Sequence, residues 1–241
     1  MPLLPALAQL AQHLPGRCML CHAWPAPPLC PQCVEGFARP RPRCATCALP
    51  VPAGVERCGA CLREPPPLHA CVAAVDWAWP WTQCIARMKF SSQPGLAAPL
   101  AGVLARAGGV AELLAGADAL LPMPSSAQRM GERGYNPALL LARQLAACVP
   151  DAPPVQRRWL LHPRHTPPQR TLPRKKRLKN LRGALAVNPR HAAEVQGKRL
   201  VLLDDVMTTG ASLHEAARTL LAAGAAQVSA IVLARAATRM G

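Results

Sequence analysis

The sequence predicts an α/β fold in which a mostly parallel sheet is flanked by helices and preceded by a small cysteine-rich module. In the last two thirds of the 241 residues, apolar runs typical of buried strands alternate with helix-periodic segments. Four C-x-x-C pairs lie before residue 62. A stiff joint, Pro65–Pro67, separates the two patterns. We therefore expect the cysteine module at residues 1–67 and the sheet-forming domain at 68–241.

Eight of the eleven cysteines belong to the four C-x-x-C pairs. This spacing lets two thiolates of a tight knuckle bind one metal ion, and two knuckles complete a tetrahedral S₄ site. In a reducing compartment the pattern favours structural zinc over disulfides. We expect a sequential arrangement because short loops close at lower entropic cost; an interleaved one, pairing the first knuckle with the third, is the alternative. The expected ligands are Cys18, Cys21, Cys30 and Cys33 for one ion, and Cys44, Cys47, Cys58 and Cys61 for the other.

The first half of the sheet-forming domain contains two short apolar runs and three helix-periodic segments. In chain order, we expect a strand, two helices, a strand and a helix at Ala70–Trp77, Trp81–Phe90, Leu96–Ala107, Asp118–Met123 and Asn136–Cys148. Pro80 stands at the start of the first helix, and Asn136-Pro137 provides a cap and a first-position proline for the last. Residues 1–16 are expected to form a further short helix.

The second half repeats the alternation after a basic segment. The expected elements are short strands at Gln156–Leu161 and Gly183–Val187, a strand at Leu200–Asp204, a helix at Leu213–Ala223 and a strand at Val228–Ala234. Gly224 closes the helix. Strands that alternate with helices imply a mostly parallel sheet with helices on both faces, and such sheets bind ligands at the carboxyl ends of their strands.

The end of the strand expected at Leu200–Asp204 is the most informative feature for function. Asp204 and Asp205 are followed by a hydroxyl- and glycine-rich turn and then by a helix. The N–H groups and the helix dipole at such a turn bind phosphate, while the acids accept hydrogen bonds from vicinal hydroxyls or help to place a divalent cation. The order predicts a sugar-phosphate site. A Walker B strand end or a plain helix cap is the alternative, but a Walker B strand requires a G-x-x-x-x-G-K-[ST] loop, which the chain does not have.

The segment VLLDDVMTTGAS resembles the 5-phosphoribosyl-1-pyrophosphate (PRPP) loop of type I phosphoribosyltransferases. The resemblance implies this fold, and it implies that Asp204 and Asp205 meet the ribose 2′- and 3′-hydroxyls of a PRPP molecule bound with magnesium. It assigns the 5′-phosphate to the turn residues Thr208, Thr209, Gly210, Ala211 and Ser212.

Two further segments match this resemblance. PMPSSAQRMGERGYN lies where the family binds pyrophosphate, which implies roles for Ser125, Ser126, Arg129 and Arg133; an ordinary strand-to-helix connection is the alternative. TPPQRTLPRKKRLKNLRGAL lies where the family has its flexible catalytic loop, which implies that Lys175 and Lys176 help to hold pyrophosphate.

Together with the four knuckles, these motifs resemble the ComF/GntX family over nearly the whole chain. The resemblance implies a double zinc ribbon and a role in DNA uptake during natural transformation or in the use of DNA as a nutrient. Two hypotheses stay open. One is a phosphoribosyltransferase whose acceptor and general base the sequence does not identify. The other is a catalytically inactive module that senses PRPP or a nucleotide and binds single-stranded DNA or a DNA-processing partner.

The net charge of +16 is concentrated between residues 152 and 193, where eleven Lys or Arg and no carboxylate occur. Such a block indicates an anionic partner, either pyrophosphate or a nucleic acid backbone, with a solvated surface loop as the alternative. Aromatic residues make up only 3% of the chain, which argues against an extended base-stacking surface. No run of about 18 apolar residues occurs, so we expect no membrane span and a cytoplasmic location.

Overall fold

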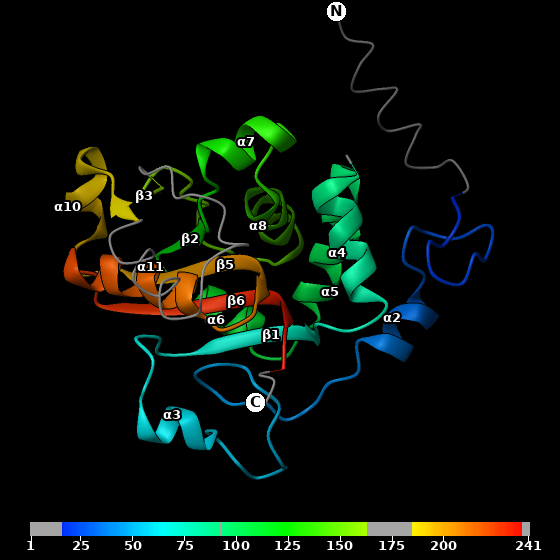
Figure 1. Ribbon diagram of the computed structural model, residues 1–241, viewed down its shortest axis with the longest axis horizontal. Helices are drawn as coiled ribbons and strands as arrows, with labels where there is room; N and C mark the ends of the chain where they lie inside the picture. Colours follow the sequence, from blue (N-terminus) through cyan, green and yellow to red (C-terminus); the bar gives the residue numbers. More distant parts are fainter. Residues whose placement is uncertain (1–15, 92, 163–184, 238–241) are drawn as a thin grey trace, which may run out of the picture. The chain divides into compact units, whose positions relative to one another are not determined.

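A computed structural model of the chain describes residues 16–91, 93–162 and 185–237 (Figure 1). The chain divides into two compact units, Met1–Arg39 and Pro40–Gly241. This division lies between the second and third C-x-x-C pairs and precedes the boundary that the sequence predicts at residue 67. The last two knuckles are therefore part of the same unit as the sheet.

The main sheet of the larger unit has four parallel strands in the order β1-β6-β5-β2. They are β1 (Cys71–Asp76), β2 (Ala119–Pro122), β5 (Arg199–Met207) and β6 (Gln227–Arg235). The two central strands, β5 and β6, are mostly apolar and mostly buried, as expected for strands covered on both faces. The predicted parallel α/β sheet is confirmed.

Strand β5 extends further than the sequence predicts. The expected end at Asp204 is wrong, because β6 continues alongside β5 until Met207 pairs with Arg235. The two aspartates therefore lie within the last part of a hydrogen-bonded strand, which restricts their backbone more than a turn would.

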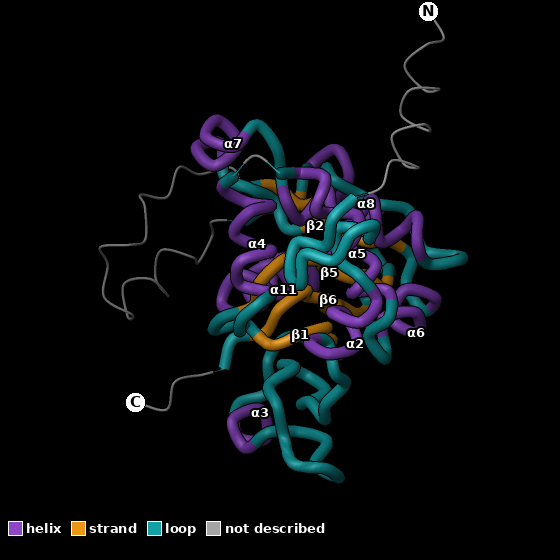
Figure 2. Tube along the Cα trace, turned by 90° about the vertical axis from the view of Figure 1, so that its right-hand side faces the viewer, coloured by secondary structure: helices purple, strands orange, loops and turns teal. Residues whose placement is uncertain are grey.

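Helices cover both faces of this sheet. The described helices of the sheet-forming part are α4 (Trp81–Phe90), α5 (Ala97–Ala105), α6 (Val110–Ala115), α7 (Ala127–Arg133), α8 (Pro137–Cys148), α10 (Ala192–Val195) and α11 (Ala211–Ala222). Figures 1 and 2 show α11 on one face and α5 and α8 on the other. The side chain of Asn136 caps α8 as predicted, its oxygen accepting the N–H of Ala138 at 3.0 Å. A 3₁₀ turn, Pro94–Leu96, begins the helix expected at Leu96–Ala107.

A small antiparallel pair, β3 (Leu160–Leu161) and β4 (Ala186–Val187), forms a second sheet. Strand β3 is shorter than the expected Gln156–Leu161, because residues 154–156 instead run along the free edge of β2. There the N–H of Gln156 donates to the Leu120 carbonyl at 2.9 Å. Of the strand expected at Gly183–Val187, the first two residues lie outside the described residues. Most of the basic block and the helix expected before Gly16 lie outside the described residues.

No helix within the described ranges is both long enough and apolar enough to cross a bilayer.

Candidate functional site

The two adjacent aspartates, hereafter the acid pair, lie at the carboxyl end of β5 beside a lysine from α4. Asp205 is buried, and its Oδ1 atom lies 2.6 Å from Nζ of Lys89. The backbone N–H of Asp205 donates to Oδ1 of Asp204 at 2.9 Å. Lys89 was not identified from the sequence. The available signal was a cation at the end of the helix that follows the carboxyl end of β1, next to the buried Met88.

Asp204 is held in an environment that disfavours its charge. Burial raises the pKa of Asp204 to about 7, and the negative charge of Asp205 acts in the same direction. Lys89, the N–H of Asp205 and the guanidinium of Arg129 oppose this rise in pKa. Asp204 therefore changes between hydrogen-bond donor and acceptor near neutral pH, as is common for groups at ligand sites.

The turn that the sequence predicts to bind the 5′-phosphate, hereafter called the phosphate turn, comprises residues Thr208–Ser212 and leads from β5 into α11. Thr208 and Thr209 are exposed, whereas Ala211 and Ser212 already belong to the first turn of the 12-residue helix. The Ala211 N–H donates to Oγ1 of Thr209 at 3.3 Å. Among the described residues, the N–H groups of Thr208, Thr209 and Gly210 find no acceptor. The turn therefore offers donors at a helix N-terminus, which suits an anion.

Gly210 is required by the shape of this turn. Its φ of +81° lies in the left-handed region, and a Cβ at this position would stand 2.5 Å from Cε of Met207 and 2.9 Å from Nε2 of His214. Only glycine fits here without a shift of neighbouring atoms.

The segment expected to bind pyrophosphate surrounds α7. Ser126 caps this helix by accepting the N–H of Arg129 at 3.4 Å, and Ser125 next to it is half-buried. Arg129 lies close enough to the acid pair to affect the pKa of Asp204. The guanidinium carbon of Arg133 instead lies 4.6 Å from the centre of the Phe90 ring. A pyrophosphate role for these residues stays a prediction, and Lys175 and Lys176 lie outside the described residues.

The segment that follows α7 is hydrogen-bonded to α4, the helix that carries Lys89. The Tyr135 hydroxyl donates to the carbonyl of Met88. The side-chain amide of Asn136 donates to the carbonyl of Met123 at 2.9 Å. The loop after β2 and the lysine of the acid pair are therefore held in a fixed relation.

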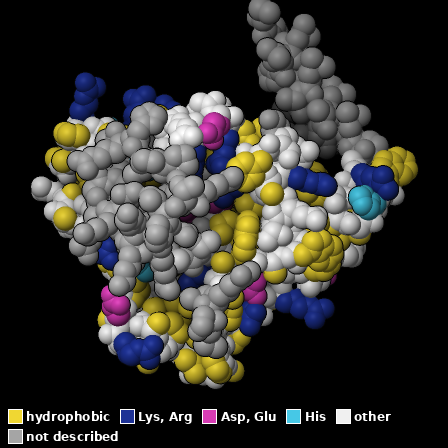
Figure 3. Space-filling view, in the orientation of Figure 1, with side chains coloured by type: hydrophobic (Ala, Val, Ile, Leu, Met, Phe, Trp, Pro, Cys, Tyr) yellow, Lys and Arg dark blue, Asp and Glu magenta, His cyan; other side chains and the backbone are white. Residues whose placement is uncertain are grey.

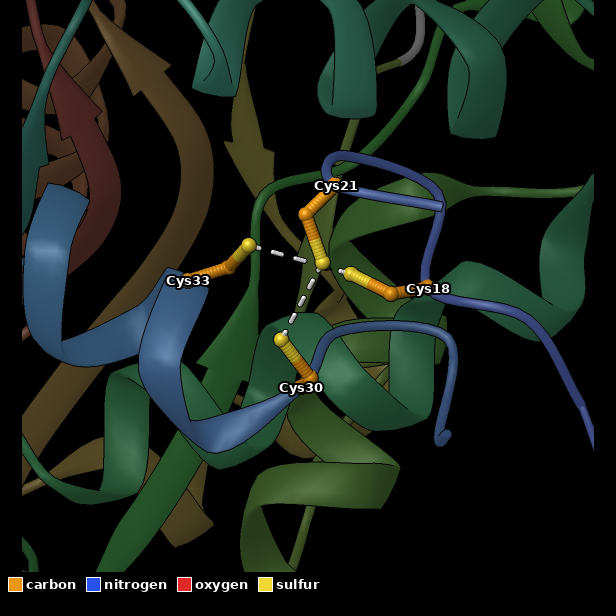
Figure 4. A group of neighbouring side chains, drawn as sticks. All are labelled: Cys18, Cys21, Cys30 and Cys33. Atoms are coloured by element: carbon orange, nitrogen blue, oxygen red, sulfur yellow. Dashed lines mark hydrogen bonds between the residues drawn. The ribbon is translucent and has the colours of Figure 1, made fainter. Parts of the chain in front are cut away.

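The first cysteine group lies in the smaller unit. Figure 4 shows the four Sγ atoms pointing toward one another, two from a tight turn and two from the beginning of α2 (Pro31–Phe37). The members of this group are Cys18, Cys21, Cys30 and Cys33.

The second cysteine group repeats the design in the larger unit. Its first knuckle is a tight turn, and its second lies at the beginning of α3 (Gly59–Arg63). In both groups the residue after the first knuckle, His22 or Ala48, has a positive φ. The members of the second group are Cys44, Cys47, Cys58 and Cys61. The structure therefore has the sequential arrangement and not the interleaved one.

The sulfur positions fit a metal ion. The ligand atoms of each group lie within 4.8 Å of one another. Three of the S–S distances are 3.8 Å (Cys18–Cys33), 3.6 Å (Cys21–Cys30) and 3.7 Å (Cys47–Cys58). Tetrahedral zinc with bonds of ~2.3 Å places its sulfurs ~3.8 Å apart. Each group could therefore hold a zinc ion with all four positions filled, leaving none for substrate.

The electrostatics of the first group agree with this fit. Burial acts to raise the pKa of Cys18, but N–H donors such as that of Cys21 bring it down to about 6. Burial and the neighbouring sulfurs raise the pKa of Cys33. Without a metal ion, four thiols this close together do not all ionise. A bound cation would displace the remaining protons.

The second cysteine group is attached to the main sheet. The N–H of Cys71, at the start of β1, donates to the carbonyl of Ala45 at 2.7 Å. At the other end of β1, Asp76 pairs with Arg41 at 2.6 Å and with Arg43 at 2.8 Å. The last residue of β6, Arg235, donates from Nε to the carbonyl of Cys47 at 2.7 Å. The sequence did not indicate this attachment.

A basic hollow of about 380 Å³ is lined by residues of α8 and by residues 155–158, the segment that begins along the free edge of β2. Among the residues that line it are Arg143, Arg157, Arg158 and His191. On the face shown in Figure 3, the Lys and Arg side chains of the described residues form separate groups and no single continuous patch.

Comparison with known proteins agrees with this architecture. The phosphoribosyl transferase domain model matches residues 134–240. The DNA utilization protein YhgH of Salmonella typhimurium is 32% identical over 234 residues, which cover 92% of this chain and 98% of that protein. The competence protein F of Haemophilus influenzae is 32% identical over 202 residues, covering 81% and 85%. The competence protein ComFC of Bacillus subtilis is 37% identical over 117 residues, covering 48% and 44%.

Solved structures with partial similarity include the allosteric regulatory enzyme of purine biosynthesis, with a TM-score of 0.33 and 20% identity over 57% of this chain and 26% of that one. Another is the glutamine PRPP amidotransferase of B. subtilis complexed with ADP and GMP, with a TM-score of 0.36 and 18% identity over 62% and 30%. The DNA utilization protein and competence protein F, which match over most of this chain, show its family. This chain belongs to the ComF/GntX family and carries a phosphoribosyltransferase domain of the type I fold.

Proposed function

We propose that the chain binds PRPP, or the ribose 5-phosphate part of it, at the acid pair and the phosphate turn. The observation that carries this proposal is the sequence of groups at one sheet edge. Asp204 and Asp205 lie in the last part of β5, which ends at Met207, and the donors of Thr208–Gly210 follow Met207 at the N-terminus of α11. The carboxylates accept the two ribose hydroxyls, and the turn receives the 5′-phosphate.

Lys89 has a supporting role in this proposal. Two ionised carboxylates side by side repel each other, and the Lys89 ammonium, 2.6 Å from Asp205, offsets that repulsion. The pyrophosphate of PRPP would lie toward Ser125, Ser126 and Arg129, with magnesium supplying additional positive charge to it. If the chain transfers the phosphoribosyl group, these positive groups stabilise the departing pyrophosphate.

We place this activity in DNA uptake or DNA utilisation, because the relatives that match over most of the chain carry those names. The two cysteine groups would hold structural zinc, and thiols in this number need a reducing compartment to stay unoxidised. We therefore propose a cytoplasmic location.

Calorimetric titration of the zinc-loaded chain with PRPP, with and without Mg²⁺, tests the binding proposal. We expect saturable binding of one PRPP per chain, and its loss when both acidic residues are replaced (Asp204→Asn with Asp205→Asn). Unchanged affinity in the double variant would overturn the site assignment. Release of pyrophosphate on addition of bases or nucleotides would identify an enzyme, and its absence with intact PRPP binding would identify a sensing module.

A second function, binding of single-stranded DNA, is favoured by the basic hollow. Each of its three arginines can pair with a phosphate, and the affinity for a single strand then falls with salt by ~0.7 logarithmic units per phosphate contact. Neutralising Arg143, Arg157 and Arg158 together should reduce this slope by ~2. The matched control neutralises three exposed arginines elsewhere, Arg87, Arg106 and Arg218. Equal slopes in both triple variants, measured by fluorescence anisotropy with an oligothymidylate, would exclude the hollow.

A further inference from the structure

Arg235 joins the second cysteine group to the phosphate turn. This side chain is only 3% exposed, although it carries a charge. Its Nε donates to the Cys47 carbonyl at 2.7 Å, and its Nη1 donates to the Met207 carbonyl at 3.1 Å and to the carbonyl of Thr208. A further bond reaches the carbonyl of Ala236 at 2.6 Å. All these acceptors are backbone oxygens, so the contacts fix the course of the chain.

The two ends of this connection have different roles. Cys47 contributes its Sγ to the second cysteine group, so the position of its carbonyl depends on how that knuckle is held. Met207 and Thr208 are the residues at which β5 passes into the phosphate turn. The planar guanidinium has donors in a fixed fork, which makes it a rigid spacer between the two places.

Metal binding would act on the Cys47 end of the connection that Arg235 makes. The Cys47 and Cys58 sulfurs lie 3.7 Å apart, a separation that suits two ligands of one ion. The metal would hold the knuckle in the conformation that presents the Cys47 carbonyl to Arg235. Without the metal, four closely spaced thiols lose their common partner and the knuckle is free to open.

We propose that Arg235 couples metal occupancy of the second cysteine group to sugar-phosphate binding at the phosphate turn. This inference rests on the proposed function, since it requires that the turn binds a sugar phosphate. Loaded metal keeps Arg235 in place, and Arg235 keeps the carbonyls of Met207 and Thr208, where β5 passes into the turn, directed away from the incoming anion. By linkage, a sugar phosphate must strengthen metal binding by the same factor by which metal strengthens sugar-phosphate binding.

The reciprocal effect is measured with zinc and ribose 5-phosphate as probes. Replacing Cys18 and Cys21 with serine in the full chain leaves the second group as the zinc site that is followed. Zinc affinity is then obtained by competition with a chromophoric chelator, with and without saturating ribose 5-phosphate. We expect the ligand to raise zinc affinity by about tenfold, within the range usual for coupled sites.

Arg235→Gln tests the route of the coupling. We expect this variant to bind both probes, with the ligand-dependent change in zinc affinity reduced to less than twofold. The matched control, Arg218→Gln, removes an exposed arginine of α11 and should keep the full effect. Circular dichroism verifies that each variant is folded. Should Arg235→Gln not fold, Arg235→Lys replaces it, and the measurement on the chain with Arg235 intact decides the matter by itself.

The outcomes separate the two proposals. If the zinc-loaded chain does not bind ribose 5-phosphate or PRPP, the proposed function fails. If it binds ribose 5-phosphate and zinc affinity does not change, the coupling is refuted while the proposed function stands. An unchanged tenfold effect in Arg235→Gln would refute the role of Arg235.

Discussion

Replacing Asp204 with asparagine should stabilise the ligand-free protein while weakening its binding site. The carboxylate has a pKa of about 7, against an ordinary value of 3.8. Because a pKa difference of one corresponds to ~1.4 kcal/mol, the ionised group costs the folded state up to about 4 kcal/mol. We expect about half of this, ~2 kcal/mol, to be recovered at pH 8, because Asp204 is partly exposed and its charge is screened. Asparagine keeps the acceptor for the N–H of Asp205.

The pH dependence distinguishes this cause from others. Between pH 4 and pH 7, folded Asp204 retains a proton that the unfolded chain has lost, so the free energy of unfolding falls as pH rises through this window. The free energy of unfolding of the Asp204→Asn variant does not fall in this way. Its gain in stability over the parent at pH 5.5 should therefore be about half of the gain at pH 8. Urea unfolding of the zinc-loaded chains, followed by tryptophan fluorescence at both pH values, measures the difference.

A control carboxylate should behave differently. Asp118 lies at the amino edge of the sheet, where it accepts the N–H of Arg199 at 2.7 Å and faces the Lys198 and Arg199 side chains. Asp118→Asn removes a favourable acceptor charge and should bring no gain in stability. The reasoning is refuted if Asp204→Asn is no more stable than the parent at pH 8, or if its gain is the same at pH 5.5.

The other predictions concern the same region and the metal sites. Lys89→Met should weaken ribose 5-phosphate binding about tenfold by removing the cation beside Asp205, whereas Arg87→Gln on the same helix should not; equal calorimetric affinities would contradict this. Ribose 5-phosphate affinity should rise between pH 6 and pH 8 as Asp204 and the phosphate of the ligand ionise, and Asp204→Asn should reduce that rise. Gly210→Ala should destabilise the chain by at least ~1 kcal/mol, while Gly102→Ala, with open space in α5, should cause no loss on urea unfolding. Elemental analysis of freshly reduced protein should find two zinc ions per chain, and a value near zero would exclude the metal sites.

The sequence was sufficient for the parts of the fold that local pattern determines. The apolar runs of β5 and β6 are long and buried, so their hydrophobicity marks them as central strands. The cap at Asn136 and the helix α4 were also found because their signals lie within a few residues. The grouping of the cysteines followed from loop length alone.

Features that depend on distant parts of the chain were missed. Strand β5 extends past Asp204 because β6 pairs with it, which no pattern within β5 reveals. Lys89 and Asp205 are 116 positions apart in sequence, and only the packing of α4 near the sheet edge brings them to 2.6 Å. Three short helices, α2, α3 and α7, were missed for a different reason. They have five to seven residues, which is too few for a clear helical period.

The attachment of the second cysteine group is the largest feature that sequence reasoning did not supply. The proline run indicated a boundary at residue 67, yet hydrogen bonds from Cys71 and Arg235 join the knuckle before it to the sheet after it. An arginine directly after the apolar run of β6 was the available signal. Its importance follows from its burial and from its carbonyl partners, which are tertiary properties.

A crystal structure of the zinc-loaded chain with ribose 5-phosphate tests the central claim most directly. We predict that the ribose hydroxyls lie within hydrogen-bond distance of the Asp204 and Asp205 carboxylates, and that the phosphate accepts N–H groups of residues 208–212. A ligand bound elsewhere, or a phosphate turn that remains empty at saturating ligand, would contradict the account.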